Sequence, residues 1–142
     1  MIILYKTDER VGVLYPAPKC ALSLEEIALK DAPEGAVTKI TEGSELPDMD
    51  FIEAWESDDK LTKVTINLSK AKVITKDRLR RERTLFLKEQ DILFMRAQES
   101  GADTSAIVAE KNRLRDITKD ADSCKTTDEL KALKVKADNP KK

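Results

Sequence analysis

The sequence predicts an α+β protein: a small, mostly antiparallel β domain with one short helix, followed by a long helix that forms a helical hairpin. Short apolar segments separated by turn residues fill the first half. Residues 69–100 contain no glycine or proline and repeat apolar side chains at helical spacing. Gly101 then interrupts the pattern before a second helical segment begins. We therefore expect an acidic α+β domain at 1–68 and a helical hairpin arm, with a short C-terminal helix, at 69–142.

The first domain opens with two strand-like segments, residues 1–5 and 11–15, separated by a polar turn. Such a pair predicts a β-hairpin. Pro16 and Pro18 lack an amide donor and restrict the residues before them, so they end the second strand. The chain is therefore expected to leave the sheet after residue 15.

A short helix and two further strands complete the predicted domain. Ser23 and Glu26 have the spacing of a capping box, which predicts a helix over residues 23–31. Residues 36–41 resemble a third strand, and residues 61–68 alternate as a strand with one buried face. An acidic loop and the only tryptophan lie between those two strands.

The long helix is predicted from Ser69, a candidate N-cap, to Ser100, with Gly101 as a left-handed stop. About 30 residues at a rise of 1.5 Å give a rod of roughly 45 Å. Its apolar positions form a wide stripe that favours packing against a partner. They are Ala71, Ile74, Leu85, Ile92 and Met95, with Leu79, Phe86 and Leu93 on an adjoining line.

The second helical segment spans residues 105–119, and the short connection before it predicts an antiparallel hairpin. We expect one stripe of each helix to face the other across this hairpin. The stripes are Leu85, Ile92 and Met95 on the first helix and Ile107, Leu114 and Ile117 on the second, with Ala121 next along the second stripe. Thr127 begins a last short helix that carries Leu130 and Leu133.

Two observations predict a homo-oligomer. The second helix, at ~15 residues, covers only about half of the rod, so some of Phe86, Leu87, Phe94 and Met95 are expected to meet another chain. The charge is also divided: residues 1–68 carry 7 Lys/Arg against 14 Asp/Glu, whereas residues 69–142 carry 19 against 13. Opposite charges can bring the two halves of neighbouring copies together. A chance excess of acidic residues in strands and loops explains the division equally well.

The composition argues against an enzyme. The chain has no histidine, which excludes Ser-His and Cys-His nucleophile systems and the usual zinc sites. We expect no catalytic residue, no cofactor and no metal ion. An acidic group in the first domain lacks the spacing of a calcium loop and predicts a solvated surface rather than a Mg²⁺ or Ca²⁺ site. Its members are Glu45, Asp48, Asp50, Glu53, Asp58 and Asp59.

A basic run on the long helix is the best candidate for binding nucleic acid, because several cations on one helix could neutralise phosphates. It consists of Lys76, Arg78, Arg80, Arg81 and Arg83. Asp77 and Glu82 interrupt it, and no aromatic residues alternate with it for base stacking. A salt-bridged exposed face or a protein interface is therefore favoured over nucleic-acid binding.

Six residues are the candidates for a protein interface: Trp55, Arg80, Arg83, Phe86, Phe94 and Met95. Trp55 has two readings, since tryptophan is a common interface anchor, but a lone tryptophan in a small sheet usually lies in the core. Phe86, Phe94 and Met95 are interpreted as packing groups rather than as a ligand site.

Several short segments, in this order along the chain, resemble a family of small tail-associated or tail-assembly (chaperone-like) proteins of tailed bacteriophages and prophages. They are Pro16-Ala-Pro18 with Cys20, Leu24-Glu-Glu-Ile27, Lys30-Asp-Ala-Pro33, Ser44-Glu-Leu-Pro47, Phe51 with Ala54-Trp55-Glu56, Lys70-Ala71, Asp77-Arg-Leu-Arg80, Leu114-Arg-Asp116 and Asp128-Glu-Leu130. The Leu-Arg-Asp segment also resembles the C-terminal helix of phage tail assembly chaperones.

The resemblance implies a non-enzymatic protein that contacts tail or tail-fibre components, either in the virion at the tail tip or fibre junction or in the host cytoplasm during assembly. No catalytic residue comes with it. The alternative is a phage-encoded inhibitor or regulator that binds a host protein. No apolar run approaches the ~18 residues of a membrane span. The start of the sequence has no signal peptide, so Cys20 and Cys124 are expected to be free thiols in a reducing compartment, and the alternative is a disulfide between them.

Overall fold

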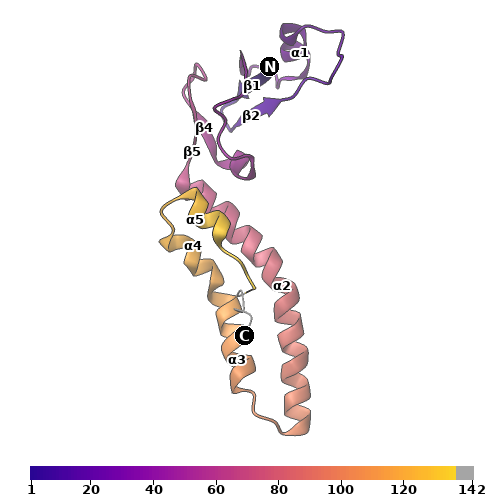
Figure 1. Ribbon diagram of the computed structural model, residues 1–142, viewed down its shortest axis with the longest axis vertical. Coiled ribbons are helices and arrows are strands. Elements are labelled where there is room, and N and C mark those ends of the chain that lie inside the picture. Colours follow the sequence, from indigo (N-terminus) through magenta and orange to yellow (C-terminus); the bar gives the residue numbers. More distant parts are fainter. Residues whose placement is uncertain (137–142) are drawn as a thin grey trace. The chain divides into compact units, whose positions relative to one another are not determined.

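The computed structural model describes residues 1–136 and confirms the α+β class (Figure 1). The chain divides into two compact units, the first spanning Met1–Ala71 and the second beginning at Lys72, within the long helix. In chain order the elements are β1 (Ile2–Lys6), β2 (Val11–Leu14), α1 (Leu24–Asp31), β3 (Val37–Thr41), η1 (Met49–Ala54), β4 (Trp55–Ser57), β5 (Val64–Ile66), α2 (Leu68–Ser100), α3 (Ser105–Asp116), η2 (Ile117–Lys119), α4 (Asp120–Ser123) and α5 (Thr127–Ala132).

The first unit contains a three-stranded antiparallel sheet in the order β2-β1-β3. The predicted hairpin and third strand are confirmed, with ends that differ by one residue. Gly12 lies opposite Tyr5 in the β1–β2 register. A Cβ at residue 12 would stand 2.4 Å from Cζ of the Tyr5 ring. The ring therefore lies across a position that only glycine leaves open.

Each face of this sheet has its own cover. Ile2 and Leu4 of β1 pack on one side with Trp55 and Val64 from the β4–β5 pair. Ile3 points to the other side, where Ile27 and Ala28 of α1 cover it. Because β1 is central, its side chains are buried on both faces, which explains the unbroken apolar run at its start.

The capping box at the start of α1 is confirmed. The Ser23 hydroxyl accepts from the Glu26 amide at 3.2 Å, and the Glu26 carboxylate accepts from the Ser23 amide at 2.7 Å. These bonds satisfy two donors at the helix end without any contribution from the rest of the fold. The start of α1 is therefore set by local sequence.

The strand predicted over residues 61–68 is wrong in length, because only Val64–Ile66 pair as β5. Leu61 has a φ of 52° and places its buried side chain in the core beside β4 and β5, so the extended backbone cannot begin there. At the other end the chain already turns into a helix at residue 68.

The N-cap of α2 is Asn67, not the predicted Ser69. The Asn67 side-chain oxygen accepts from the amide of Lys70 at 3.1 Å, and its backbone carbonyl accepts from the amide of Ala71 at 2.9 Å. Ser69 already lies in the first turn and is exposed. Both residue types are good caps. Asn67 takes the position because its backbone N–H donates to the Ala54 carbonyl at 2.8 Å, and this bond fixes where the chain enters the helix.

We predict that Asn67→Ala lowers the free energy of unfolding by about 1 kcal/mol, the usual cost of losing an N-cap. Ser69→Ala is the matched control, and it should leave stability nearly unchanged because Ser69 does not cap the helix. Urea unfolding of both variants, followed by far-UV circular dichroism, measures the difference. Equal losses, or a larger loss for Ser69→Ala, would contradict the assignment.

The end of α2 confirms the predicted stop at Gly101, which has a φ of 69°. The amide of Ala102 donates to the carbonyl of Ala97 at 2.8 Å, and the amide of Gly101 donates to the carbonyl of Gln98 at 3.2 Å. This pair of bonds is a Schellman motif, which closes the last turn of a helix when the following residue is left-handed.

In the second unit α3 runs back beside α2 as the predicted hairpin (Figure 1). A hydrophobic core lies between them, and the segments after α3 also contribute to it. Its buried members are Leu79, Leu114, Ile117 and Val135, with Phe86, Leu87 and Leu133 packed against them. Of the stripe predicted for this side, Leu114, Ile117 and Ala121 are confirmed as buried, whereas Ile107 is only half-buried. Residues 137–142, the end of the predicted arm, lie outside the described part of the chain.

The stripe predicted for the α2 side of the hairpin is wrong. Leu85, Ile92 and Met95 are exposed by 68%, 45% and 56% of their surface. The buried and half-buried line instead follows Leu79, Arg83, Phe86, Gln90, Phe94 and Ala97. Successive members of this line are three or four residues apart, so it forms one face of the helix. Two polar residues on it hid the line from a search for apolar periodicity.

Candidate protein interface

The candidate site is the side of α2 that points away from α3, which we call the outer face. It consists of six exposed residues: Arg81, Leu85, Lys88, Ile92, Met95 and Glu99. They are separated by steps of four and three residues and span an arc of roughly 80° at 100° per residue. Three large apolar side chains therefore lie in one exposed line between charged residues.

The buried and half-buried line of α2 described above, from Leu79 to Ala97, is called the inner line. Contacts with the rest of the second unit hold it in place. Arg83 donates from one guanidinium nitrogen to the backbone carbonyls of Leu114 at 3.2 Å and Arg115 at 2.6 Å. Those carbonyls lie in the last turn of α3, where free acceptors and the helix dipole favour a cation. This explains how an arginine occupies a line that packs inside the hairpin.

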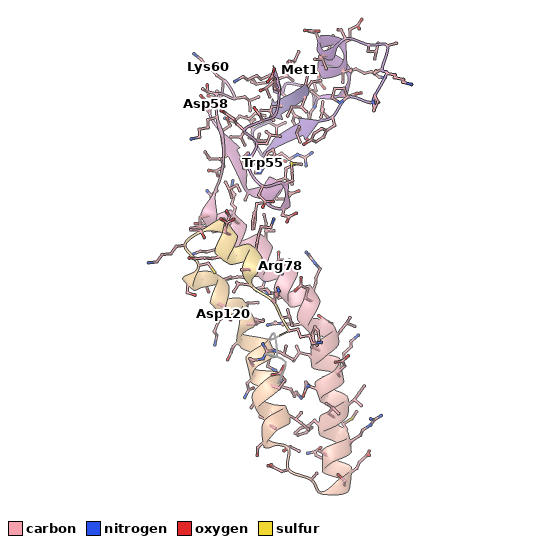
Figure 2. All side chains as sticks on the ribbon, viewed as in Figure 1. Met1, Trp55, Asp58, Lys60, Arg78 and Asp120 are labelled. Carbon is pink, nitrogen blue, oxygen red and sulfur yellow. The ribbon has the colours of Figure 1, made fainter. Side chains whose placement is uncertain are left out.

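Two further arginines hold the C-terminal segment onto the hairpin. Arg78 donates to the carbonyls of Leu130 at 3.2 Å and Leu133 at 2.9 Å, at the end of α5 (Figure 2). Arg113 donates to the carbonyl of Val135 at 2.9 Å. Arg113 also hydrogen-bonds Glu110, which holds the pKa of that carboxyl below its ordinary value. The segment after α3 is thereby fixed against α2 and covers part of the rod.

Near the connection between the helices, α2 and α3 are joined by polar contacts. Lys111 forms an ion pair with Asp91 at 2.6 Å, and its ammonium lies 5.0 Å from the centre of the Phe94 ring. Phe94 is half-buried by this arrangement. These contacts fix the rotation of α2 about its own axis, so Leu85, Ile92 and Met95 are left outside.

Most of the six predicted interface residues make contacts within the chain. Trp55 is 2% exposed, and its indole Nε1 donates to the carbonyl of Asp48 at 3.1 Å, so it belongs to the core (Figure 2). Phe86 packs against the hairpin core, and Phe94 lies under Lys111. These side chains are therefore not free anchors.

Of the other three predicted interface residues, Arg80 is exposed and pairs with Asp77 at 2.6 Å, whereas Arg83 bonds the end of α3. Met95 alone of the six lies on the outer face. Sequence reasoning placed Leu85 and Ile92 in the hairpin seam, although their spacing of seven residues is the signal of a second helical contact line.

The basic run considered for nucleic acid is largely engaged within the second unit. Lys76 pairs with Asp122 at 2.6 Å, and this hydrogen bond holds the pKa of Asp122 below its ordinary value. Arg78 pairs with Glu82 as well as with α5. Arg80 and Arg83 also have partners, so Arg81 is the one member of the run that makes no ion pair or hydrogen bond through its side chain within residues 1–136, and it lies on the outer face.

Two members of the acidic group of the first unit, Asp48 and Asp58, have local structural roles. Asp48 caps η1 by accepting from the amide of Asp50 at 2.9 Å. Asp58 accepts from the amide of Thr62 at 2.7 Å, which lowers its pKa and closes the turn between β4 and β5. Within residues 1–136 no three His, Cys, Asp or Glu side chains gather as a metal site requires.

Comparison with known proteins gives no match: no protein-family model, no curated protein and no solved structure is similar to this chain. Among the described helices, none has both the length and the apolar character that a membrane span needs.

Proposed function

We propose that this chain is a non-enzymatic bacteriophage tail protein, a structural component or assembly factor, that acts through protein contacts made by the outer face of α2. The observation that carries the contact is the exposed line of Leu85, Ile92 and Met95. The assignment to phage tails is supported by the ordered segments that resemble that family.

An exposed apolar line of this kind favours a helical partner. Leu85, Ile92 and Met95 are separated by seven and three residues, the spacing of a coiled-coil seam. Burial of such side chains is favourable by about 25 cal/mol for each Å² of apolar surface removed from water. The inner line of α2 is already covered within the chain, so the outer face is the side left for another molecule.

A second copy of this chain fits the outer face in an antiparallel arrangement. If Leu85 lies opposite Met95 of the second copy, then Ile92 lies opposite Lys88 and Arg81 lies opposite Glu99. Every layer then joins two apolar groups, an apolar group with a lysine stem, or two opposite charges. A parallel pair would instead place Arg81, Lys88 and Glu99 each against its own copy. Charge complementarity therefore selects the antiparallel pair.

Glu89 limits the strength of this antiparallel pair. It lies next to Lys88 on the flank of the outer face and would approach Glu89 of the second copy near the two-fold axis. Two like charges at such a short distance weaken association. We infer a reversible dimer. When it dissociates, the outer face of each copy becomes available to bind a tail-fibre helix during assembly.

The test is deletion of the gene from the phage or prophage that carries it, followed by electron microscopy and mass spectrometry of purified particles. We expect particles that lack fibres or tail-tip components. Detection of the protein in wild-type virions identifies a structural component, and its absence identifies an assembly factor. Fully fibred, infectious particles from the deletion strain would overturn the proposal and favour the inhibitor of a host protein.

A further inference from the structure

The first unit has a surface of its own that is open to a partner, the free edge of β3. The sheet order β2-β1-β3 leaves one edge of β3 unpaired within residues 1–136. Its five residues pair with β1 without a bulge, from Val37 opposite Lys6 to Thr41 opposite Ile2. Alternate residues of an edge strand direct their amide and carbonyl groups away from the sheet. The β3 edge is therefore a regular row of backbone donors and acceptors.

A hollow lies directly beside this edge, between β3 and α1. Its walls are Ala28 and Leu29 of α1, the loop of residues 33–36, and Thr38 and Ile40 of β3. Thr38 and Ile40 pair with Tyr5 and Ile3, so they lie on the sheet face that α1 covers. A strand added to β3 would continue the pleat and place every second side chain in this hollow.

The hollow offers an apolar contact for such a side chain. Leu29 of α1 is 90% exposed, and Ile40 of the edge strand, on the opposite wall of the hollow, is half-buried. Proteins usually protect a free edge with proline, a bulge or an outward lysine. β3 has neither proline nor bulge, and its one lysine, Lys39, is exposed but donates to the backbone carbonyl of Leu61 at 3.0 Å, so its ammonium is held against the first unit.

The charges around the edge select the partner. Residues 25–42 carry five acidic side chains, Glu25, Glu26, Asp31, Glu34 and Glu42, against only Lys30 and Lys39. A second copy of the first unit would bring this acidic surface against itself, which disfavours β3–β3 pairing. A basic extended segment satisfies both the charges and the backbone groups.

We infer that the β3 edge and its hollow bind an extended, lysine- or arginine-containing segment of a partner protein by strand addition. Backbone hydrogen bonds to β3 supply affinity, and the side chain seated between Leu29 and Ile40 supplies selectivity. This surface is separate from the outer face of α2 and goes beyond the proposed function, so either can fail without the other.

The test uses a short end-blocked peptide of alternating lysine and valine, titrated into the full-length protein and followed by backbone amide NMR shifts. Two matched peptides serve as controls, one with glutamate in place of lysine and one with N-methylated amides at alternate residues, which cannot pair as a strand. We expect shifts confined to residues 25–41 with the first peptide and none with the controls.

Leu29→Lys removes the apolar wall and adds a repelling charge, so it should weaken binding of the basic peptide by about tenfold or more. Val73→Lys, at an exposed apolar residue of the second unit that is off the outer face, should leave binding unchanged. The inference is overturned if the N-methylated peptide binds equally well, if shifts map to α2, if no peptide shifts any amide, or if residues 37–41 shift with protein concentration alone.

Discussion

Leu114→Ala is expected to lower the free energy of unfolding of the second unit by about 2–5 kcal/mol, as truncation of a fully buried leucine usually does. Leu114 is 1% exposed and packs with Leu79 and Ile117 in the hairpin core. Leu79→Ala should have a similar cost, because Leu79 is completely buried on the inner line of α2. Removal of either side chain leaves a cavity that the helices cannot close.

The measurement is urea unfolding followed by far-UV circular dichroism, which reports mainly on α2 and α3. Fluorescence of Trp55, the only tryptophan, reports separately on the first unit and should change little. Leu85→Ala is the matched control on the same helix, and its effect should stay within about 0.5 kcal/mol because the side chain is exposed. A loss for Leu85→Ala as large as that for Leu114→Ala would show that the wrong line of α2 has been placed inside the hairpin.

Ile92→Lys is expected to weaken self-association of the protein by about tenfold or more. Ile92 lies in the middle of the outer face opposite Lys88 of the second copy, so a lysine there would replace an apolar contact by two like charges. The monomer should remain folded, because Ile92 does not belong to the hairpin core. Sedimentation velocity at micromolar concentration, at low and high salt, measures the dimer.

Two further variants sharpen this prediction. Val73→Lys places the same charge at an exposed position of α2 that is off the outer face, and it should leave the dimer intact. Glu89→Gln removes the like-charge contact near the two-fold axis and should strengthen the dimer, most visibly at low salt. A wild type that stays monomeric throughout, or equal effects of Ile92→Lys and Val73→Lys, would exclude the outer face as a self-association surface.

Of the outer face, only Met95 was among the residues predicted from the sequence for a protein interface. Met95 was also grouped with Leu85 and Ile92 in one line, and that line was assigned to the seam with α3. An α-helix that carries apolar residues on two sides has no local signal for which side is covered. Trp55 was ambiguous for a similar reason. The carbonyl of Asp48 that accepts a hydrogen bond from its indole N–H is brought near only by the fold.

The sequence by itself determined the features that depend on neighbouring residues. The capping box of Ser23 and Glu26, the stop at Gly101 and the stripe of Leu114 and Ile117 follow from bonds or spacings within a few positions along the chain. Such features need no distant partner, so a pattern of residues is sufficient to predict them.

The tertiary structure alone decided which side of α2 faces α3. Arg83 lies on the inner line because its guanidinium reaches the free carbonyls at the end of α3, and Asn67 replaces Ser69 as the cap because the Ala54 carbonyl holds it. In each case the partner is a backbone group far away in sequence. A polar side chain is favourable in a packed position only when such a partner is present. The residues next to that side chain in the sequence do not show whether the partner is there.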